Sequence, residues 1–208
     1  MTTLAQPSAV KAGAQCLALG TVQFGMSYGV SNTSGRVPLE TARMMVQLAI
    51  ASGIDTVDTA IGYGESEQVL GSIGMGELKM VSKLPPLPAR VTNVRAWVLS
   101  KAEKSLENLG VKQLHGLLLH RSSDLFGSTG VELYAAMRDL QEAGKVRKLG
   151  VSIYAPTELD AHEGMYAFDL IQAPINLVDH GLAPRGWLIR LKEQGCEVHA
   201  RSTFLHGL

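Results

Sequence analysis

The sequence predicts an α/β fold with a parallel sheet, of the (β/α)8 TIM-barrel kind. Short apolar segments alternate with longer segments whose apolar residues recur at helical spacing. Glycines close four of the helical segments directly before the next strand, at Gly53, Gly110, Gly144 and Gly195. The strands read as near-continuous apolar runs, which is typical of strands covered on both faces. Strict alternation implies right-handed crossovers into one parallel sheet.

Seven strands are predicted in chain order. They cover residues 16–21, 55–60, 79–84, 115–120, 148–154, 170–175 and 197–203. Helices are predicted between them, beginning at Pro38 and then at 66–71, 95–109, 131–143, 156–163 and 187–194. Proline suits a first helical turn because its φ is already helical.

Apolar stripes predict which face of two helices is buried. The helix at 131–143 carries Leu133, Ala136, Met137 and Leu140 at helical spacing. The helix that begins at Pro38 carries Met44, Met45, Leu48 and Ala49. Both stripes are expected to pack in the core.

The predicted barrel is incomplete, with about seven βα units. An eight-stranded barrel typically takes about 250 residues, whereas this chain has 208 and stops just past the seventh strand. We expect a C-terminally truncated single barrel domain at residues 15–208, after a flexible lead-in at 1–14. Unpaired edges on the first and seventh strands predict a chain that is poorly stable alone or depends on a partner. A doubly wound sheet is disfavoured, because Glu67 replaces the third glycine of the dinucleotide fingerprint in G-Y-G-E-S-E.

The composition narrows the class of protein further. Basic and acidic residues balance at 19 each, which gives no indication of nucleic-acid binding. No apolar run approaches the roughly 18 residues of a membrane span, and the N-terminus lacks a secretory pattern, so a cytoplasmic protein is expected. Cys16 and Cys196 lie in or beside predicted strands, where buried thiols are expected rather than a disulfide. No metal site is predicted.

Polar residues gather where the predicted strands end, the edge of a βα barrel that carries its chemistry. Asp58 ends the second strand, Lys83 the third and His120 the fourth. Tyr63 follows the second strand between Gly62 and Gly64, whose freedom would let the phenol lean over the rim. Each residue alone has a structural alternative, as a helix cap, a solvated strand end or a core histidine. Together at adjacent strand ends they predict a catalytic site.

The four residues suit proton transfer to a carbonyl oxygen. A free phenol has a pKa of about 10, and the Lys83 ammonium is expected to lower the pKa of Tyr63. Asp58 would keep Lys83 charged, and His120 would orient the substrate oxygen. Because no side chain supplies a hydride, a hydride-donating cofactor is implied.

With these residues the sequence resembles the aldo-keto reductase family. The matching segments are L-G-T-V-Q-F-G, D-T-A-I-G-Y-G-E-S-E, V-S-K, L-L-L-H, L-G-V-S and Q-A-P-I-N-L, in this order along the chain. The L-G-T-V-Q-F-G opening resembles a bacterial branch often linked to sugars. The resemblance implies a (β/α)8 barrel that binds NADP(H) without a Rossmann motif. It also implies Tyr63 as general acid, with Asp58, Lys83 and His120 as its partners.

The resemblance further implies the cofactor contacts. Thr21 and Val22 would lie near the nicotinamide ribose, together with Asp58. Ser152 and Gln172 would hold the nicotinamide carboxamide, with Arg201 and Ser202 on the seventh strand. The chain departs from the family at two of these places. Ile153 stands where many members have asparagine, and Arg201 where many have an aromatic residue. Contacts to the adenosine 2′-phosphate would come from the absent eighth unit.

Three functions remain open on the sequence. The first is an NADP(H)-dependent oxidoreductase that reduces a small aldehyde, ketone or sugar carbonyl. The second is a cofactor-binding module with little turnover, like the potassium-channel β-subunit relatives of this family. The third is an inactive truncated remnant. The oligomeric state and the identity of the substrate stay open.

Overall fold

The computed structural model describes residues 16–205, and the predicted lead-in at 1–14 lies outside them. Seven parallel strands form one sheet in the order β1-β2-β3-β4-β5-β6-β7. The strands are β1 Ala18–Gly20, β2 Thr56–Asp58, β3 Lys79–Leu84, β4 Leu114–Leu119, β5 Val146–Ser152, β6 Leu170–Pro174 and β7 Glu197–Arg201. All seven predicted strands are present, and β3 has the predicted bounds.

Helices connect most of these strands. They are α2 Val22–Gly25, α3 Leu39–Ala51, α4 Ser66–Ile73, α5 Val94–Leu109, the 3-10 helix η1 Ser122–Leu125, α6 Gly127–Glu142, α7 Pro156–His162 and α8 Trp187–Glu193. The segments of α2 and η1 are not among the predicted helices. Each is four residues long, which is too short to establish a helical period.

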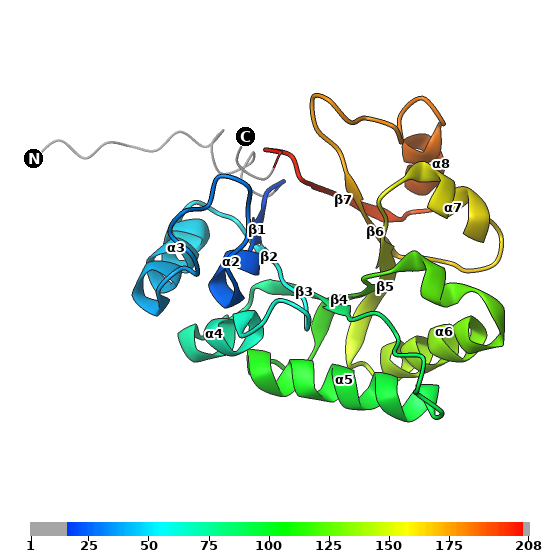
Figure 1. The fold of residues 1–208 in the computed structure, drawn as a ribbon, viewed down its shortest axis with the longest axis horizontal. Coiled ribbons are helices and arrows are strands. Elements are labelled where there is room, and N and C mark those ends of the chain that lie inside the picture. The colour runs from blue at the N-terminus through cyan, green and yellow to red at the C-terminus, as the bar shows by residue number, and fades with distance from the viewer. Residues whose placement is uncertain (1–15, 206–208) are drawn as a thin grey trace, which may run out of the picture.

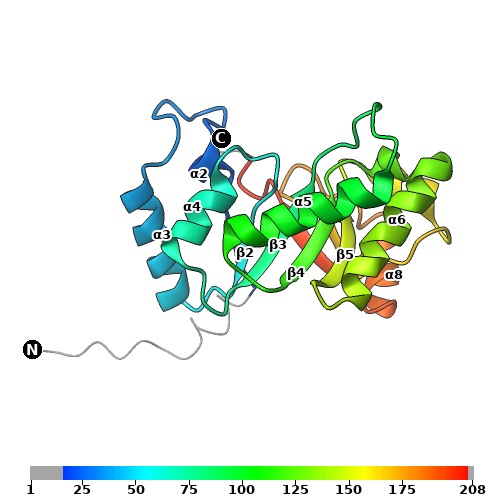
Figure 2. The same cartoon turned by 90° about the horizontal axis from the view of Figure 1, so that it is seen from below.

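The sheet curls into an incomplete barrel with the helices on its outer side (Figure 1). Seen from below, α4, α5 and α6 lie against the outer face of the strands (Figure 2). In the described part of the chain, β1 pairs only with β2 and β7 only with β6. The fold is therefore the predicted barrel with seven strands and two edges.

The ends of α5 show how the sequence sets these helix boundaries. The Asn93 side chain accepts a hydrogen bond from the backbone N–H of Ala96 at 2.9 Å, which satisfies a donor of the first turn. Gly110 then ends the helix with φ +67°, in the left-handed region. Gly53, Gly144 and Gly195 also have positive φ, so each glycine predicted to close a helix adopts the conformation that favours it.

The core has two layers. The larger cluster fills the space between the sheet and the outer helices, and the smaller cluster of Val81, Leu118 and Leu170 packs inside the curled sheet. The predicted stripe on α6 is correct: each of its four members, Leu133, Ala136, Met137 and Leu140, is buried.

The predicted stripe on α3 is wrong for three of its four members. Met44 is 60% exposed and Leu48 67%, and Met45 is exposed as well. The buried residues of this helix are Ala42, Val46 and Ala49. These also recur at helical spacing, so α3 has two apolar faces, and its place against the sheet decides which one is covered.

The two cysteines differ in burial. Cys196 is buried as expected, whereas Cys16 is exposed because it precedes β1 at the rim of the sheet. Burial raises the pKa of the Cys196 thiol to about 12, with Asp169 adding to the rise. Within residues 16–205, no helix combines the length and apolar character needed to cross a bilayer.

Candidate active site

A buried ion pair lies at the carboxyl ends of β2 and β3. The Lys83 side chain is fully buried, and its Nζ donates to Asp58 Oδ1 at 2.7 Å and to the Thr59 carbonyl oxygen at 2.9 Å. Gln172 of β6 donates from Nε2 to the same Asp58 oxygen at 2.7 Å. Since β6 is not a neighbour of β2, the Asp58 carboxylate ties three strands together across the sheet interior.

Tyr63 lies on the turn between β2 and α4, and two glycines make this turn possible. Gly64 has φ +57°, which glycine adopts without steric cost. Gly25, at the end of α2, lies so close that a Cβ there would be 1.7 Å from the Tyr63 carbonyl oxygen. Nothing lies within 4 Å of a Cβ built on Gly62. The turn therefore depends on Gly64 and Gly25, and the expectation that Gly62 is also needed was wrong.

The helix behind the turn is anchored by buried polar residues. Ser66, the first residue of α4, places its Oγ 2.9 Å from the Thr21 carbonyl oxygen. Thr21 Oγ1 in turn donates to the Asp58 carbonyl oxygen at 2.8 Å. Glu67 is 3% exposed and accepts a hydrogen bond from Ser82 of β3 at 2.7 Å. In the sequence Glu67 stands out only as a departure from a glycine fingerprint, and no local signal marks it as an anchor.

The four residues predicted to converge do lie together. The rings of Tyr63 and His120 meet edge to face, with centroids 5.7 Å apart and planes at 76°. Lys83 Nζ lies 5.2 Å from the centroid of the Tyr63 ring. Asp58 completes the cluster through its ion pair with Lys83.

The electrostatics of the cluster differ from the expectation for Tyr63. Burial raises the pKa of the Tyr63 phenol well above its ordinary value, and the Asp58 carboxylate raises it further. The predicted lowering of this pKa is not found, because burial and the Asp58 carboxylate dominate the shift. Burial lowers the pKa of Lys83. Burial also lowers the pKa of His120, and the Lys83 charge adds to that effect.

A cavity of about 380 Å³ opens beside this cluster. Its walls contain Asp58, Tyr63 and His120, together with most of the residues expected to contact a cofactor. The latter are Val22, Ser152, Gln172, Arg201 and Ser202. Thr21 is absent from the walls and is 1% exposed. Its hydroxyl binds the β2 backbone instead, so its side chain is turned away from the predicted cofactor site.

The cavity is also lined by residues that were not predicted from the sequence. Met26, Tyr28 and Tyr154 line it, and the Arg201 guanidinium carbon lies 4.2 Å from the centroid of the Tyr154 ring. Tyr154 follows the strand-end Ser152 by two residues, so its position at the rim was a usable signal. Ile153 between them is buried in the outer core, which accounts for an apolar residue at that position.

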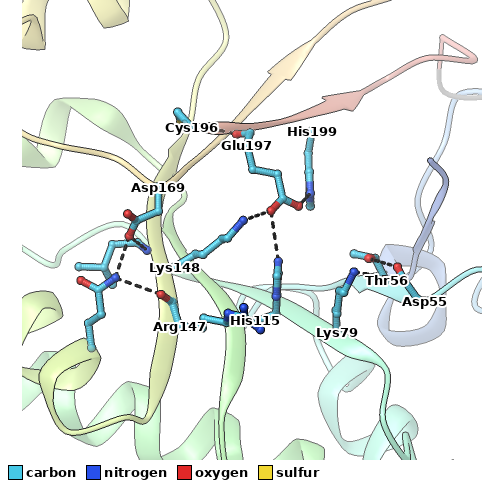
Figure 3. A network of polar contacts seen from close by, with 12 residues as sticks. Asp55, Thr56, Lys79, His115, Arg147, Lys148, Asp169, Cys196, Glu197 and His199 are labelled. Carbon is cyan, nitrogen blue, oxygen red and sulfur yellow. Dashed lines mark hydrogen bonds and ion pairs between the residues drawn. The ribbon is translucent and has the colours of Figure 1, made fainter. Parts of the chain in front are cut away.

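A second polar cluster lies at the amino ends of the strands, on the far side of the inner apolar layer. Glu197 of β7 is its centre and forms an ion pair with Lys148 of β5. His199 Nε2 lies 2.6 Å from Glu197 Oε1, and His115 Nε2 lies 3.4 Å from Glu197 Oε2. Figure 3 shows these side chains converging on Glu197 from β4, β5 and β7.

The charge of Glu197 is strongly stabilised by this arrangement. Burial alone would raise the pKa of Glu197, but hydrogen bonds from Lys148 and His199 outweigh it and hold the pKa at about 2. Burial lowers the pKa of His115, against the attraction of Glu197. In the described part of the chain, no group of three or more His, Cys, Asp or Glu side chains is arranged to hold a metal ion.

Fold and site together define a βα-barrel protein with a polar cluster at the carboxyl ends of its strands. Residues 16–208 match the model of the aldo/keto reductase family. The chain belongs to that family.

Two relatives illustrate the match. The aldo-keto reductase YhdN of Bacillus subtilis is 26% identical over 174 residues, which are 78% of this chain and 50% of YhdN. Aflatoxin B1 aldehyde reductase member 2 of Rattus norvegicus is 29% identical over 149 residues, 68% of this chain and 37% of that protein. The chain thus spans about half or less of the length of these relatives.

A solved structure supports the fold. The Bombyx mori aldo-keto reductase AKR2E4, in complex with NADP, superposes with a TM-score of 0.67 at 23% identity. The superposition covers 90% of this chain and 62% of that one.

Proposed function

We propose that this chain carries the catalytic site of an NADP(H)-dependent oxidoreductase that reduces an aldehyde or ketone, with a sugar carbonyl among the candidates. The observation that carries the proposal is the convergence of Asp58, Tyr63, Lys83 and His120 beside one cavity. Two similar proteins, an aflatoxin B1 aldehyde reductase and an aldo-keto reductase in complex with NADP, support this class of reaction.

The residues around the cavity fit a nicotinamide cofactor. Ser152 and Gln172 are buried and line the wall, where their hydroxyl and amide groups would bind the nicotinamide carboxamide. Gln172 donates to Asp58, so its amide is already oriented and its Oε1 remains for a donor. Val22, Arg201 and Ser202 line the same cavity. When bound, NADP(H) would supply the hydride.

Tyr63 would give its proton to the substrate oxygen as negative charge develops there. Its raised pKa keeps the phenol protonated at neutral pH, as a general acid requires. His120 is kept neutral by burial and by the Lys83 charge, so the imidazole can hydrogen-bond the same oxygen. Lys83, held by Asp58, would stabilise the phenolate once the proton has left.

Replacing Tyr63 by phenylalanine tests this role. The oxidation of NADPH with a simple aromatic aldehyde should slow by about 10²–10⁴-fold, the usual contribution of a general acid. Binding of NADPH, followed by its fluorescence, should persist, because the ring remains in place. A variant that turns over as fast as the wild type would show that Tyr63 is not the acid.

The wild-type chain separates the two other functions in the same assays. Binding of NADPH without oxidation by any aldehyde would indicate a cofactor-binding module. Failure to bind NADPH at all would indicate an inactive remnant.

A further inference from the structure

We propose that Glu67 is a positioning residue, which fixes the turn of Tyr63 against the strand that carries Lys83. This inference rests on the proposed function and adds a residue to the same site. Glu67 is the second residue of α4, directly behind the turn. It is 3% exposed and is not part of the cavity wall, so it would act through Tyr63 and Lys83 and not on the substrate.

The carboxyl group of Glu67 binds neutral donors from two other elements. Ser82 Oγ of β3 donates to Oε1 at 2.7 Å, and Ser105 Oγ of α5 donates to the same oxygen at 2.5 Å. Asn108 Nδ2 of α5 lies 3.4 Å from Oε2. Both serines are fully buried, where hydrogen bonds are stronger than in water. Glu67 therefore joins α4 to β3 and to α5, and β3 is an inner strand that pairs with β2 and β4.

The bond to Ser82 connects Glu67 with the buried ion pair. Successive side chains of a strand point to opposite faces of the sheet. Ser82 points outward to Glu67, and Lys83, the next residue, points inward to Asp58 at 2.7 Å. A bond that holds Ser82 therefore also holds the backbone from which the Lys83 side chain departs.

The start of α4 connects Glu67 with the turn. The backbone N–H of Ser66 donates to the Tyr63 carbonyl oxygen at 3.1 Å, so the first turn of the helix continues directly from the Tyr63 turn. Lys83 Nζ lies 5.2 Å from the centroid of the Tyr63 ring. Glu67 binds together, from behind the site, the helix and the strand on which this distance depends.

The two serines give a matched pair of variants. Ser82→Ala and Ser105→Ala each remove one buried hydroxyl that donates to Glu67 Oε1, so they should lower the urea midpoint of unfolding to a similar extent. Only Ser82→Ala separates α4 from β3. Its kcat for NADPH oxidation with an aromatic aldehyde should fall roughly 10- to 100-fold, as expected for a displacement of up to about 1 Å. Ser105→Ala should lose much less. Equal kcat values for the two variants would overturn the proposal.

Two further readouts distinguish positioning from a general loss of structure. Binding of NADPH, followed by its fluorescence, should be unchanged in Ser82→Ala, because the altered contact lies outside the cavity. The solvent deuterium isotope effect on kcat should increase in this variant, because a displaced Tyr63 makes proton transfer slower than the other steps. An unchanged isotope effect together with weakened NADPH binding would indicate a structural role alone.

Substitutions of Glu67 itself test whether the reach of its side chain matters. Glu67→Gln keeps the length and an acceptor oxygen, so it should retain most of the wild-type kcat. Glu67→Asp keeps the carboxyl group but is one methylene shorter, and it should lose about 10²-fold in kcat. A loss in Glu67→Gln as large as that in Glu67→Asp would count against positioning by reach.

Amide hydrogen exchange separates this proposal from the proposed function, because it requires no turnover. The backbone amides of Tyr63 and Ser66 are hydrogen-bonded within the turn. They should exchange faster in Ser82→Ala than in the wild type, and Ser105→Ala should leave them protected. If this pattern is found but no aldehyde is reduced, the proposed function fails and the positioning of the turn stands. If the turn exchanges equally in both variants, the positioning proposal fails even where the wild type reduces aldehydes.

Discussion

The curled sheet holds two polar clusters, one at each end of its strands, and their charged groups have different surroundings. At the amino ends, the Glu197 carboxylate contacts the side chains of Lys148, His115 and His199. At the carboxyl ends, Asp58 forms an ion pair with Lys83, and a cavity lined by Asp58, Tyr63 and Arg201 opens beside the pair.

We infer a structural role for the Glu197 cluster and a binding role for the cluster at the carboxyl ends. A buried ion pair contributes little net stability when its desolvation is counted, so a closed cluster such as that of Glu197 mainly fixes which strands meet. A polar cluster that lines a cavity leaves groups that a ligand can contact. The position of this cavity, at the strand ends where barrel enzymes carry their sites, agrees with a binding role.

Removing the buried cation Lys83 from the cluster at the carboxyl ends should have the largest effect on stability. In Lys83→Met the Asp58 carboxylate loses its ammonium partner, and breaking such a pair costs about 3–5 kcal/mol. The free energy of unfolding, measured with urea, should fall by that amount. The double variant Lys83→Met with Asp58→Asn should recover part of the loss, because no buried charge is then left unpaired. A double variant as unstable as the single one would contradict the pairing.

Moving the turn that carries Tyr63 should lower activity and leave the Glu197 cluster at the amino ends unchanged. In Gly25→Ala the new Cβ would lie 1.7 Å from the Tyr63 carbonyl oxygen, so the turn has to shift. A displacement of about 1 Å can cost roughly 10²-fold in rate, and we expect a loss of that order in kcat/KM for aldehyde reduction. Gly181→Ala is the matched control, since a Cβ there would make an ordinary 3.4 Å contact with Pro156. Equal activities for the two variants would argue against this placement of Tyr63.

Removing the charge of Glu197 at the amino ends should have the smallest effect, and its effect on stability should depend on pH. Glu197→Gln keeps the shape of the side chain but removes its charge. Because Glu197 is 32% exposed, solvent screening limits the expected loss of unfolding free energy to about 1–2 kcal/mol at neutral pH. The folded pKa is about 2, below the ordinary 4.5. The contribution is therefore complete above pH 4.5 and disappears as the pH falls towards 2.

Urea unfolding of the wild type and Glu197→Gln between pH 3 and pH 7 measures this contribution. Their difference should narrow below about pH 4.5. Glu193→Gln removes the same charge from an exposed position on α8, and it should change stability little at any pH. A difference for Glu197→Gln that stays constant with pH would contradict its role as the charged centre of the cluster.

Local pattern was enough to predict the order of the elements. Alternating apolar runs located all seven strands, and glycines at Gly110 and Gly144 marked helix ends because both positions need positive φ. The stripe on α6 was predicted correctly since that helix has one apolar face. On α3 two apolar faces compete, and periodicity cannot tell which one meets the sheet. Short elements such as α2 lack the length that a pattern needs.

The sequence by itself determined which polar residues stand at the strand ends, because alternation and strand length are local properties of the chain. It thereby placed Asp58, Lys83 and His120 on one rim, with Tyr63 beside them. Only the tertiary structure decided their electrostatics. The direction of the Tyr63 pKa shift depends on burial and on the nearby Asp58 carboxylate. The contacts of Arg201 with Tyr154 and the Ile153 carbonyl oxygen likewise join groups far apart in sequence, which no local pattern contains.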